Sequence, residues 1–214
     1  MHLIATSKKG LSTLALQRQL PWHEANTVTL LQRKLREAME ARESLYLLGG
    51  LVEVDDAFFG GLLAEGKRGR GSENKAKVLA SVSFGRDEDY PKYCKLQVVE
   101  HLNSSTVEQT LNRTLESNTT IKTDGARFFN GLTQQGFTHH ALTMEKPEDN
   151  QQWLPWVHIV ISNAKRFILG THHSVKDIQS YLAEYSWRFN RRHCNLFERL
   201  MNTALWFNPT VIPA

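Results

Sequence analysis

The sequence predicts an α/β fold in which a mixed β-sheet is flanked by helices and preceded by a small helical segment. Three observations lead to this prediction. Apolar residues recur at helical spacing before residue 45, three segments that each carry two valines follow, and helical and strand patterns then alternate. Hairpin-linked strands followed by alternating helices and strands are typical of a mixed sheet covered by helices. A chain of 214 residues has room for one such domain and an appendage.

Residues 8–43 are predicted to be helical, with a break at Pro21-Trp22. The second helical pattern starts near Asn26, and its apolar residues lie on one face: Val28, Leu31, Leu35 and Met39. Two helices with a tight break resemble a helix-turn-helix, whose second helix would enter a DNA groove. An ordinary helical hairpin is the alternative, because Pro21 is the only turn signal.

The sheet is predicted to begin with strands at 46–54, 77–84 and 93–101, with a turn at 85–91. A helix with Val107, Leu111 and Leu115 on one face follows a candidate capping box at 105–108. The next predicted elements are a strand at 121–123, a short helix at 126–132, a strand at 139–144 and a polar loop at 145–152. This order of elements is shared by ribonuclease-H-like folds.

Two further helices are predicted near the C-terminus. Pro155 suits the first turn of a helix that ends at Gly170 and has one apolar line: Val157, Ile161, Ala164 and Ile168. The last helix is predicted to start at Ser174 and to bury Ile178, Leu182, Tyr185 and Phe189.

The basic residues are concentrated in two stretches. The net charge is +4, from 26 Lys and Arg against 22 Asp and Glu. Residues 65–77 hold five basic and two acidic side chains, and residues 164–199 hold seven and three. Such clusters suit a surface that binds phosphates, although a solvated loop has the same composition.

The cysteines and the hydropathy indicate a cytoplasmic protein without a membrane partner. Cys94 and Cys194 are isolated and form no CxxC pair, which argues against a zinc site or a disulfide framework. No window approaches 18 uninterrupted apolar residues, and the N-terminus lacks the core of a signal peptide.

Acidic residues follow two of the predicted strands. Asp55 and Asp56 come after 46–54, and Asp124 comes after 121–123. An acidic strand end is either a solvated edge or a place that holds cations. If the two strands are neighbours, Asp55 and Asp124 emerge at the same rim, as two-metal phosphoryl chemistry requires. Glu53 and Asp55 share one strand face, so Asp55 is a better ligand candidate than Asp56, and Glu53 is a supporting or exposed acid.

A third ligand would come from a downstream helix. Asn163 lies 39 positions after Asp124 and offers an amide oxygen; the alternative is an amide on the helix surface. The nearby histidines are not expected to be metal ligands: His158, His172 and His173.

Five blocks carry a family resemblance. They are VEVDDAFFGG, KRGRG, KTDGARFFNGL, VHIVISNAKRFILGTHHSV and YLAEYSWRFNRRH. In order and spacing they resemble the ISXO-like insertion-sequence transposases, bacterial DDE-type enzymes of which some carry Asn as the third member. The resemblance covers residues 8–203. It implies a helix-turn-helix-like DNA-binding segment at 1–45, a ribonuclease-H-like catalytic domain at 46–214, and a metal-binding triad of Asp55, Asp124 and Asn163.

The resemblance also implies contacts with DNA. It points to Lys165 as a contact to the DNA backbone, and the C-terminal block suggests a DNA-facing surface with Arg188, Arg191 and Arg192. Glu184 is a supporting residue, because its i,i+4 spacing allows it to pair with Arg188; a surface ion pair is the alternative. Backbone phosphates would also be tracked by the basic residues after the first catalytic strand: Lys67, Arg68, Arg70 and Lys75. Relatives commonly begin with a zinc ribbon, which this sequence lacks, so we expect a shortened member without zinc.

The expected function is that of a DNA transposase. Two Mg²⁺ or Mn²⁺ ions would support hydrolysis at an insertion-sequence end and transfer of the freed 3′-hydroxyl to target DNA. The expected partners are double-stranded terminal-repeat and target DNA and further copies of the chain, as a homodimer or larger assembly at the bacterial nucleoid. The alternative is an inactive or repurposed transposase-derived protein whose DNA binding is salt-sensitive and indifferent to Mg²⁺ and to Asp55.

Overall fold

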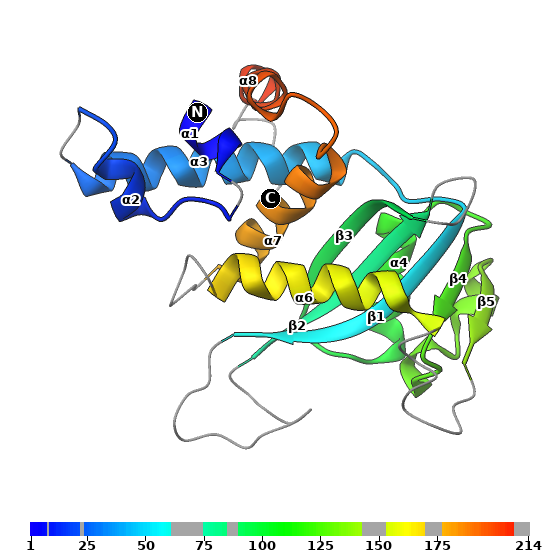
Figure 1. The fold of residues 1–214 in the computed structure, drawn as a ribbon. Helices are drawn as coiled ribbons and strands as arrows, with labels where there is room; N and C mark the ends of the chain where they lie inside the picture. The colour runs from blue at the N-terminus through cyan, green and yellow to red at the C-terminus, as the bar shows by residue number, and fades with distance from the viewer. Residues whose placement is uncertain are drawn as a thin grey trace. The chain divides into compact units, whose positions relative to one another are not determined.

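The structure is a computed structural model that describes residues 1–7, 9–21, 24–60, 75–84, 90–142, 153–169 and 177–207. The chain divides into two compact units (Figure 1). Unit 1 consists of residues 1–45 and 166–214, and unit 2 consists of residues 46–165.

Unit 2 is built on a five-stranded mixed sheet. The strands are β1 (Leu51–Phe59), β2 (Ala76–Phe84), β3 (Pro91–Val99), β4 (Thr120–Thr123) and β5 (Thr138–Ala141). They lie in the order β3-β2-β1-β4-β5. The pairs β3-β2 and β2-β1 are antiparallel, and β1-β4 and β4-β5 are parallel. This topology, with helices against the sheet, confirms the predicted ribonuclease-H-like fold.

The two faces of β1 meet different helices. Val52 and Val54 belong to an apolar core that they share with Val107 and Leu111 of α4 (Ser104–Thr114). The opposite face of the strand carries Glu53 and Asp55, which bond to residues of α6 (Pro155–Leu169). Figure 1 shows α6 running alongside β1. Both faces are buried, and Glu53 and Asp55 lie on the α6 face among apolar neighbours such as Ala57 and Val82.

The first strand lies further along the chain than predicted. It spans Leu51–Phe59 instead of 46–54, because Gly50 has a left-handed φ of 78° and pairing with β2 continues to Phe59↔Ala76. Asp55 and Asp56 thus lie within the strand, and the prediction that they follow its end is wrong. The parallel ladder with β4 is much shorter and ends at Glu53↔Lys122.

Other predicted elements of unit 2 differ from the structure in detail. The cap of α4 is Asn103, whose side chain accepts a hydrogen bond from the Thr106 amide at 2.8 Å, and not the predicted capping box at 105–108. The predicted helix at 126–132 is two 3₁₀ turns, η1 (Arg127–Phe129) and η2 (Leu132–Gln135). The predicted turn at 85–91 and loop at 145–152 lie mostly or wholly outside the described residues.

Unit 1 is helical. Its elements are α1 (His2–Thr6), α2 (Thr13–Gln17), α3 (Ala25–Ser44), α7 (Ile178–Asn190) and α8 (Leu196–Trp206). Asp177 caps α7 by accepting from the Ser180 amide, and the predicted start at Ser174 lies outside the described residues. Helix α8 was not predicted; the Asn195 side chain caps it. The core of the unit joins the terminal segments through Ile4, Leu16, Val28, Leu35, Met39, Trp187 and Leu200.

The boundary between residues 45 and 46 coincides with a predicted domain boundary, but the C-terminal helices α7 and α8 pack on α3 and group with the N-terminal segment. The DNA-binding role of residues 1–45 stays a prediction. Among the described residues, no helix is both long and apolar enough to span a membrane.

Candidate active site

Asp55 and Asp124 lie at one rim of the β1–β4 pair, just beyond the end of its ladder. The parallel ladder pairs Leu51 with Thr120 and Glu53 with Lys122. Asp55 follows Glu53 by two positions, and Asp124 follows Lys122 by two positions. The same register therefore brings both carboxylates to corresponding places where the β1–β4 ladder ends.

The two carboxylates differ in their hydrogen bonds. Asp55 is buried, with 9% of its surface exposed; its Oδ1 accepts from the Asp56 amide at 2.9 Å, and its Oδ2 lies 3.0 Å from His158 Nε2. Asp124 is half-buried, and its Oδ1 accepts from the Ala126 amide at 3.0 Å. Its Oδ2 accepts no hydrogen bond from a described residue.

The turn after Asp124 depends on Gly125. This glycine has a φ of 78°, and a Cβ there would lie 2.7 Å from the Leu142 carbonyl oxygen. Only glycine avoids both the strained φ and this contact. The TDG sequence therefore fixes the direction in which the chain leaves β4 beside Asp124.

His158 faces the acidic rim from the first turn of α6. The hydrogen bond to Asp55 raises the pKa of His158; burial lowers it, and the charges of Asp55, Glu53 and Asp124 raise it further, so that the net change is upward. The imidazole thus lies within the field of three carboxylates. Sequence reasoning set this histidine aside, although it lies close behind Pro155, which marks the start of the helix.

Glu53 is one of the most buried acids of unit 2, with 2% of its surface exposed. Its Oε2 accepts a hydrogen bond from the Val157 amide at 2.7 Å. Burial raises the pKa of Glu53 to about 7, although the amides of Val157 and Trp156 and the charges of Lys122 and His158 lower it. Of the two predicted possibilities, a supporting or an exposed acid, the structure excludes the exposed one.

Asn163 lies elsewhere on α6. It is exposed and makes no hydrogen bond to another described residue. It follows His158 by five positions, which is about 140° around the helix axis. Lys165 follows His158 by seven residues, close to two turns, and its Nζ lies 5.6 Å from the centre of the Phe59 ring of β1. The flank of α6 that faces β1 therefore carries His158 and Lys165. Asn163 lies on another flank, and its role as a metal ligand stays a prediction.

Other polar contacts hold the end of β4. Thr123 Oγ1 lies 2.8 Å from His139 Nε2, and the Thr123 carbonyl accepts from Trp153 Nε1 at 3.1 Å. Lys122 Nζ lies 5.1 Å from the centre of the Trp153 ring. These contacts fix the strand that carries Asp124.

The predicted DNA contacts are scattered over the chain. Lys67, Arg68 and Arg70 lie outside the described residues, and Lys75 is half-buried just before β2. In unit 1, Arg191 pairs with Glu43, and Arg192 donates to the Phe189 carbonyl at 2.8 Å. Both arginines are half-buried.

Arg188 is committed to the interior of unit 1. Its Nε and Nη2 donate to Glu184 Oε1 at 3.0 and 2.9 Å, Nη1 donates to the carbonyls of Ala5 and Ser7, and Nη2 also donates to the Ile4 carbonyl. All five donors of the guanidinium are thus used, three of them on the end of α1. The structure supports the predicted pairing of Glu184 with Arg188 but leaves Arg188 no donor for a phosphate.

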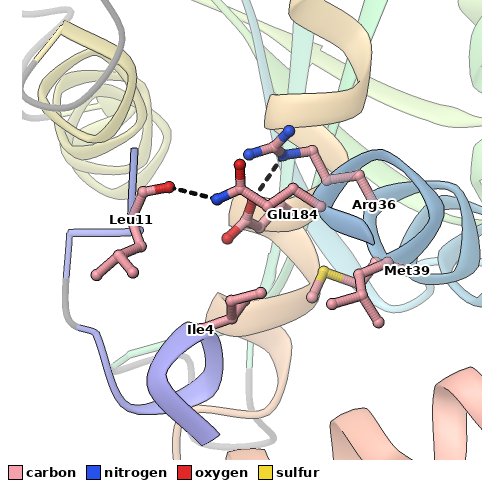
Figure 2. Close-up of a pocket in the computed structure, with 7 residues that line it drawn as sticks. Ile4, Leu11, Arg36, Met39 and Glu184 are labelled. Atoms are coloured by element: carbon pink, nitrogen blue, oxygen red, sulfur yellow. Dashed lines mark hydrogen bonds and ion pairs between the residues drawn. The ribbon is translucent and has the colours of Figure 1, made fainter. Parts of the chain in front are cut away.

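A second guanidinium completes this cluster. Arg36 Nε donates to Glu184 Oε2 at 2.9 Å, and Figure 2 shows the pair beside a small cavity lined also by Ile4, Leu11 and Met39. Burial raises the pKa of Glu184, but the charges of Arg188 and Arg36 and their hydrogen bonds outweigh burial and hold it below its ordinary value. The predicted alternative of a surface ion pair is wrong, because Glu184 is 3% exposed.

The donor set at the β1–β4 rim suits a hard divalent cation. Asp55 and Asp124 offer carboxylate oxygens, which Mg²⁺ and Mn²⁺ prefer. Among the described residues, no group of three His, Cys, Asp or Glu side chains is arranged to hold a metal ion. Two carboxylates are enough for Mg²⁺, which usually keeps several waters and takes substrate phosphates as further ligands.

The comparison with protein families assigns the chain to one family. The family model of the ISXO2-like transposase domain matches residues 47–190, which is most of the chain. The chain therefore belongs to the ISXO2-like transposase family, as its sequence blocks predicted. No curated protein matches it in sequence.

Similar solved structures are distant. The catalytic core of BIV integrase is 12% identical, over 72% of this chain and 95% of that one, with a TM-score of 0.44. The catalytic domain of Mos1 mariner transposase is 15% identical, over 83% and 95%, with a TM-score of 0.38. The Mos1 chain in a strand transfer complex is 16% identical, over 94% and 76%, with a TM-score of 0.39.

Proposed function

We propose that this protein is a DNA transposase that cleaves and joins DNA strands at the ends of an insertion sequence with the help of Mg²⁺ or Mn²⁺. The observation that carries the proposal is that Asp55 and Asp124 both lie two residues beyond the last pair of the β1–β4 ladder of a transposase-family domain. The catalytic role of these residues rests on that placement and on their chemistry.

Asp55 and Asp124 are the proposed ligands of up to two ions. Divalent cations bound there would activate a water or a 3′-hydroxyl and neutralise charge on the phosphate under attack. The protein's own part is to hold the two carboxylates in register. No covalent bond to the protein is needed.

We further propose that His158 takes the place predicted for Asn163. His158 lies 3.0 Å from Asp55, whereas Asn163 lies on a different flank of α6. Through its contact with the Asp55 carboxylate, His158 orients one proposed metal ligand. Loss of a residue that orients a metal ligand commonly lowers metal affinity or activity by about 10–100-fold. Asn163 is then the surface amide that the sequence left open.

DNA is the proposed partner. Lys165 shares the helix flank of His158 and is the proposed contact to a backbone phosphate, and Lys75 lies just before β2, which pairs with β1. Lys67, Arg68 and Arg70 precede it in the chain, and Arg191 and Arg192 are further candidates. Assembly of two or more copies on DNA in the bacterial cytoplasm, and DNA binding by residues 1–45, belong to the same proposal.

The test is a cleavage assay on labelled terminal-repeat DNA with Mg²⁺ or Mn²⁺. We expect Asp55→Asn to abolish cleavage and strand transfer, and the neighbouring Asp56→Asn to retain them, because Asp56 points to the other face of β1. Equal activity of wild type and Asp55→Asn would contradict the proposal. Binding that falls with salt but ignores both metal and Asp55 would support the alternative, a non-catalytic DNA-binding protein.

A further inference from the structure

The VEVDD segment contains a carboxylate that the proposed chemistry does not use. Glu53 lies two residues before Asp55 on the same face of β1. It is 2% exposed, so it is closed to substrate and solvent. A buried carboxylate without a partner is costly, and its place in the fold has to be explained by what it holds.

The partner of Glu53 is the start of α6. The first amides of a helix have no acceptor within the helix, and the side chain of the residue before the helix usually supplies one. Here the acceptor comes from a strand: Glu53 Oε2 accepts from the Val157 amide at 2.7 Å across 104 positions of sequence. The positive end of the helix dipole also favours a carboxylate at this place.

The anchored turn is the one that carries His158. Val157 and His158 are adjacent, as are the two bonds that they make to one face of β1: Val157 to Glu53 and His158 to Asp55. Loss of the first bond frees the helix start to shift along the strand, and the 3.0 Å contact of His158 with Asp55 depends on that position. The later turns of α6 would stay in place, because Lys165 on the same flank contacts Phe59 of β1.

We propose that Glu53 is a positioning residue that fixes the first turn of α6 on β1 and thereby holds His158 against Asp55. Glu53 touches neither substrate nor metal in this role and acts through the helix. The catalytic meaning of the inference rests on the proposed function, whereas the anchoring of the helix does not.

Hydrogen–deuterium exchange tests the anchor without DNA or metal. Three variants of Glu53 are compared with wild type: Gln keeps an acceptor oxygen, Asp keeps the charge but shortens the reach, and Leu removes both. We expect exchange in the first turn of α6 to rise about 10-fold or more in Glu53→Asp and Glu53→Leu, with β2 and β3 unchanged, and to stay within about 3-fold of wild type in Glu53→Gln. Glu100→Leu is the matched control, since that carboxylate is 88% exposed.

Two results would overturn the inference. One is unchanged exchange of the first turn in Glu53→Asp and Glu53→Leu; the other is an equal rise throughout unit 2, which would mean that Glu53 serves the fold as a whole. If Glu53→Leu does not fold, Glu53→Asp and Glu53→Gln decide the question. Cleavage assays separate the two proposals. If exchange in the first turn of α6 rises as expected but the wild-type protein does not cleave DNA, the transposase reaction is refuted and the anchoring role of Glu53 stands. If the wild-type protein cleaves DNA but exchange in the Glu53 variants is unchanged, the anchoring role is refuted and the transposase reaction stands.

Discussion

Both units of this protein bury charged side chains, but they leave them in different states. In unit 1, Glu184 lies between Arg36 and Arg188, and the five donors of Arg188 are all used within the unit. In unit 2, Asp55 meets one histidine, and one oxygen of Asp124 accepts nothing from the described residues. A saturated cluster serves the fold, while an unsaturated one is able to bind.

The same distinction applies to the C-terminal sequence block, for which both an ion pair and contacts with DNA were predicted. The RFNRRH region is basic, and composition alone indicates DNA binding. In the structure all three arginines have partners within unit 1: Arg188 donates to the end of α1, Arg191 pairs with Glu43, and Arg192 donates to the Phe189 carbonyl. Charge in a sequence therefore becomes evidence of binding only when the donors are still open.

The largest expected effect concerns the carboxylates of unit 2, Asp55 and Asp124. Asp124→Asn should lower metal-dependent cleavage about 1,000-fold or more, since it removes a proposed ligand worth several kcal/mol of transition-state stabilisation. The free energy of unfolding, measured in urea, should change little. A variant that keeps its activity and loses stability would place Asp124 in the class of Glu184.

The saturated cluster should respond in the opposite way. Glu184→Gln leaves two buried guanidiniums without their anion and should cost about 3–5 kcal/mol of unfolding free energy. Urea denaturation measures it. Arg33→Ala is the control, because the Arg33–Glu37 pair is exposed at 66% and 36% and is worth about 0.3–0.5 kcal/mol. Equal costs for the two variants would show that the buried cluster is no more important than a surface pair.

Helix α6 allows a comparison within the site. We expect His158→Ala to lower cleavage about 10–100-fold, because Asp55 loses the residue that orients it. Asn163→Ala on the other flank should stay within about 3-fold of wild type. The assay is the same for both variants, and a reversed order would restore Asn163 as the third member of the site.

The smallest effect is the acid dependence of the saturated cluster. The folded pKa of Glu184 lies below its ordinary value of 4.5, so its ion pairs stabilise the protein fully above that value. This stabilisation is lost as the pH falls through the folded pKa, when the carboxylate gains a proton. The difference in unfolding free energy between wild type and Glu184→Gln should therefore narrow below about pH 4.5. A constant difference down to pH 3 would contradict this assignment.

Much of the fold was accessible from the sequence because periodicity reports burial. The alternation of Val52 and Val54 with Glu53 and Asp55 predicted the two faces of β1, and the line through Val157 and Ile161 predicted α6. The bounds of β1 were not accessible, since pairing with β2 carries the strand through two acids that propensity would exclude.

Helix α6 shows a different limit of the sequence. Spacing along the chain suggested Asn163, but only the docking of α6 on β1 shows which flank meets Asp55. The helical phase of His158 and Lys165 was readable from their seven-residue spacing. The strand that this flank contacts could not be predicted, because β1 and α6 are about one hundred residues apart in sequence.

The short parallel ladder between β1 and β4 has a consequence for how the protein is made. Asp55 and Asp124 are joined by three residue pairs whose members lie 69 positions apart, from Leu51↔Thr120 to Glu53↔Lys122. Contacts of such long range carry a loop-closure cost and slow folding. A chain still emerging from the ribosome carries Asp55 long before Asp124 and the first turn of α6 exist. The proposed nuclease centre is thus assembled only after most of unit 2 has been synthesised.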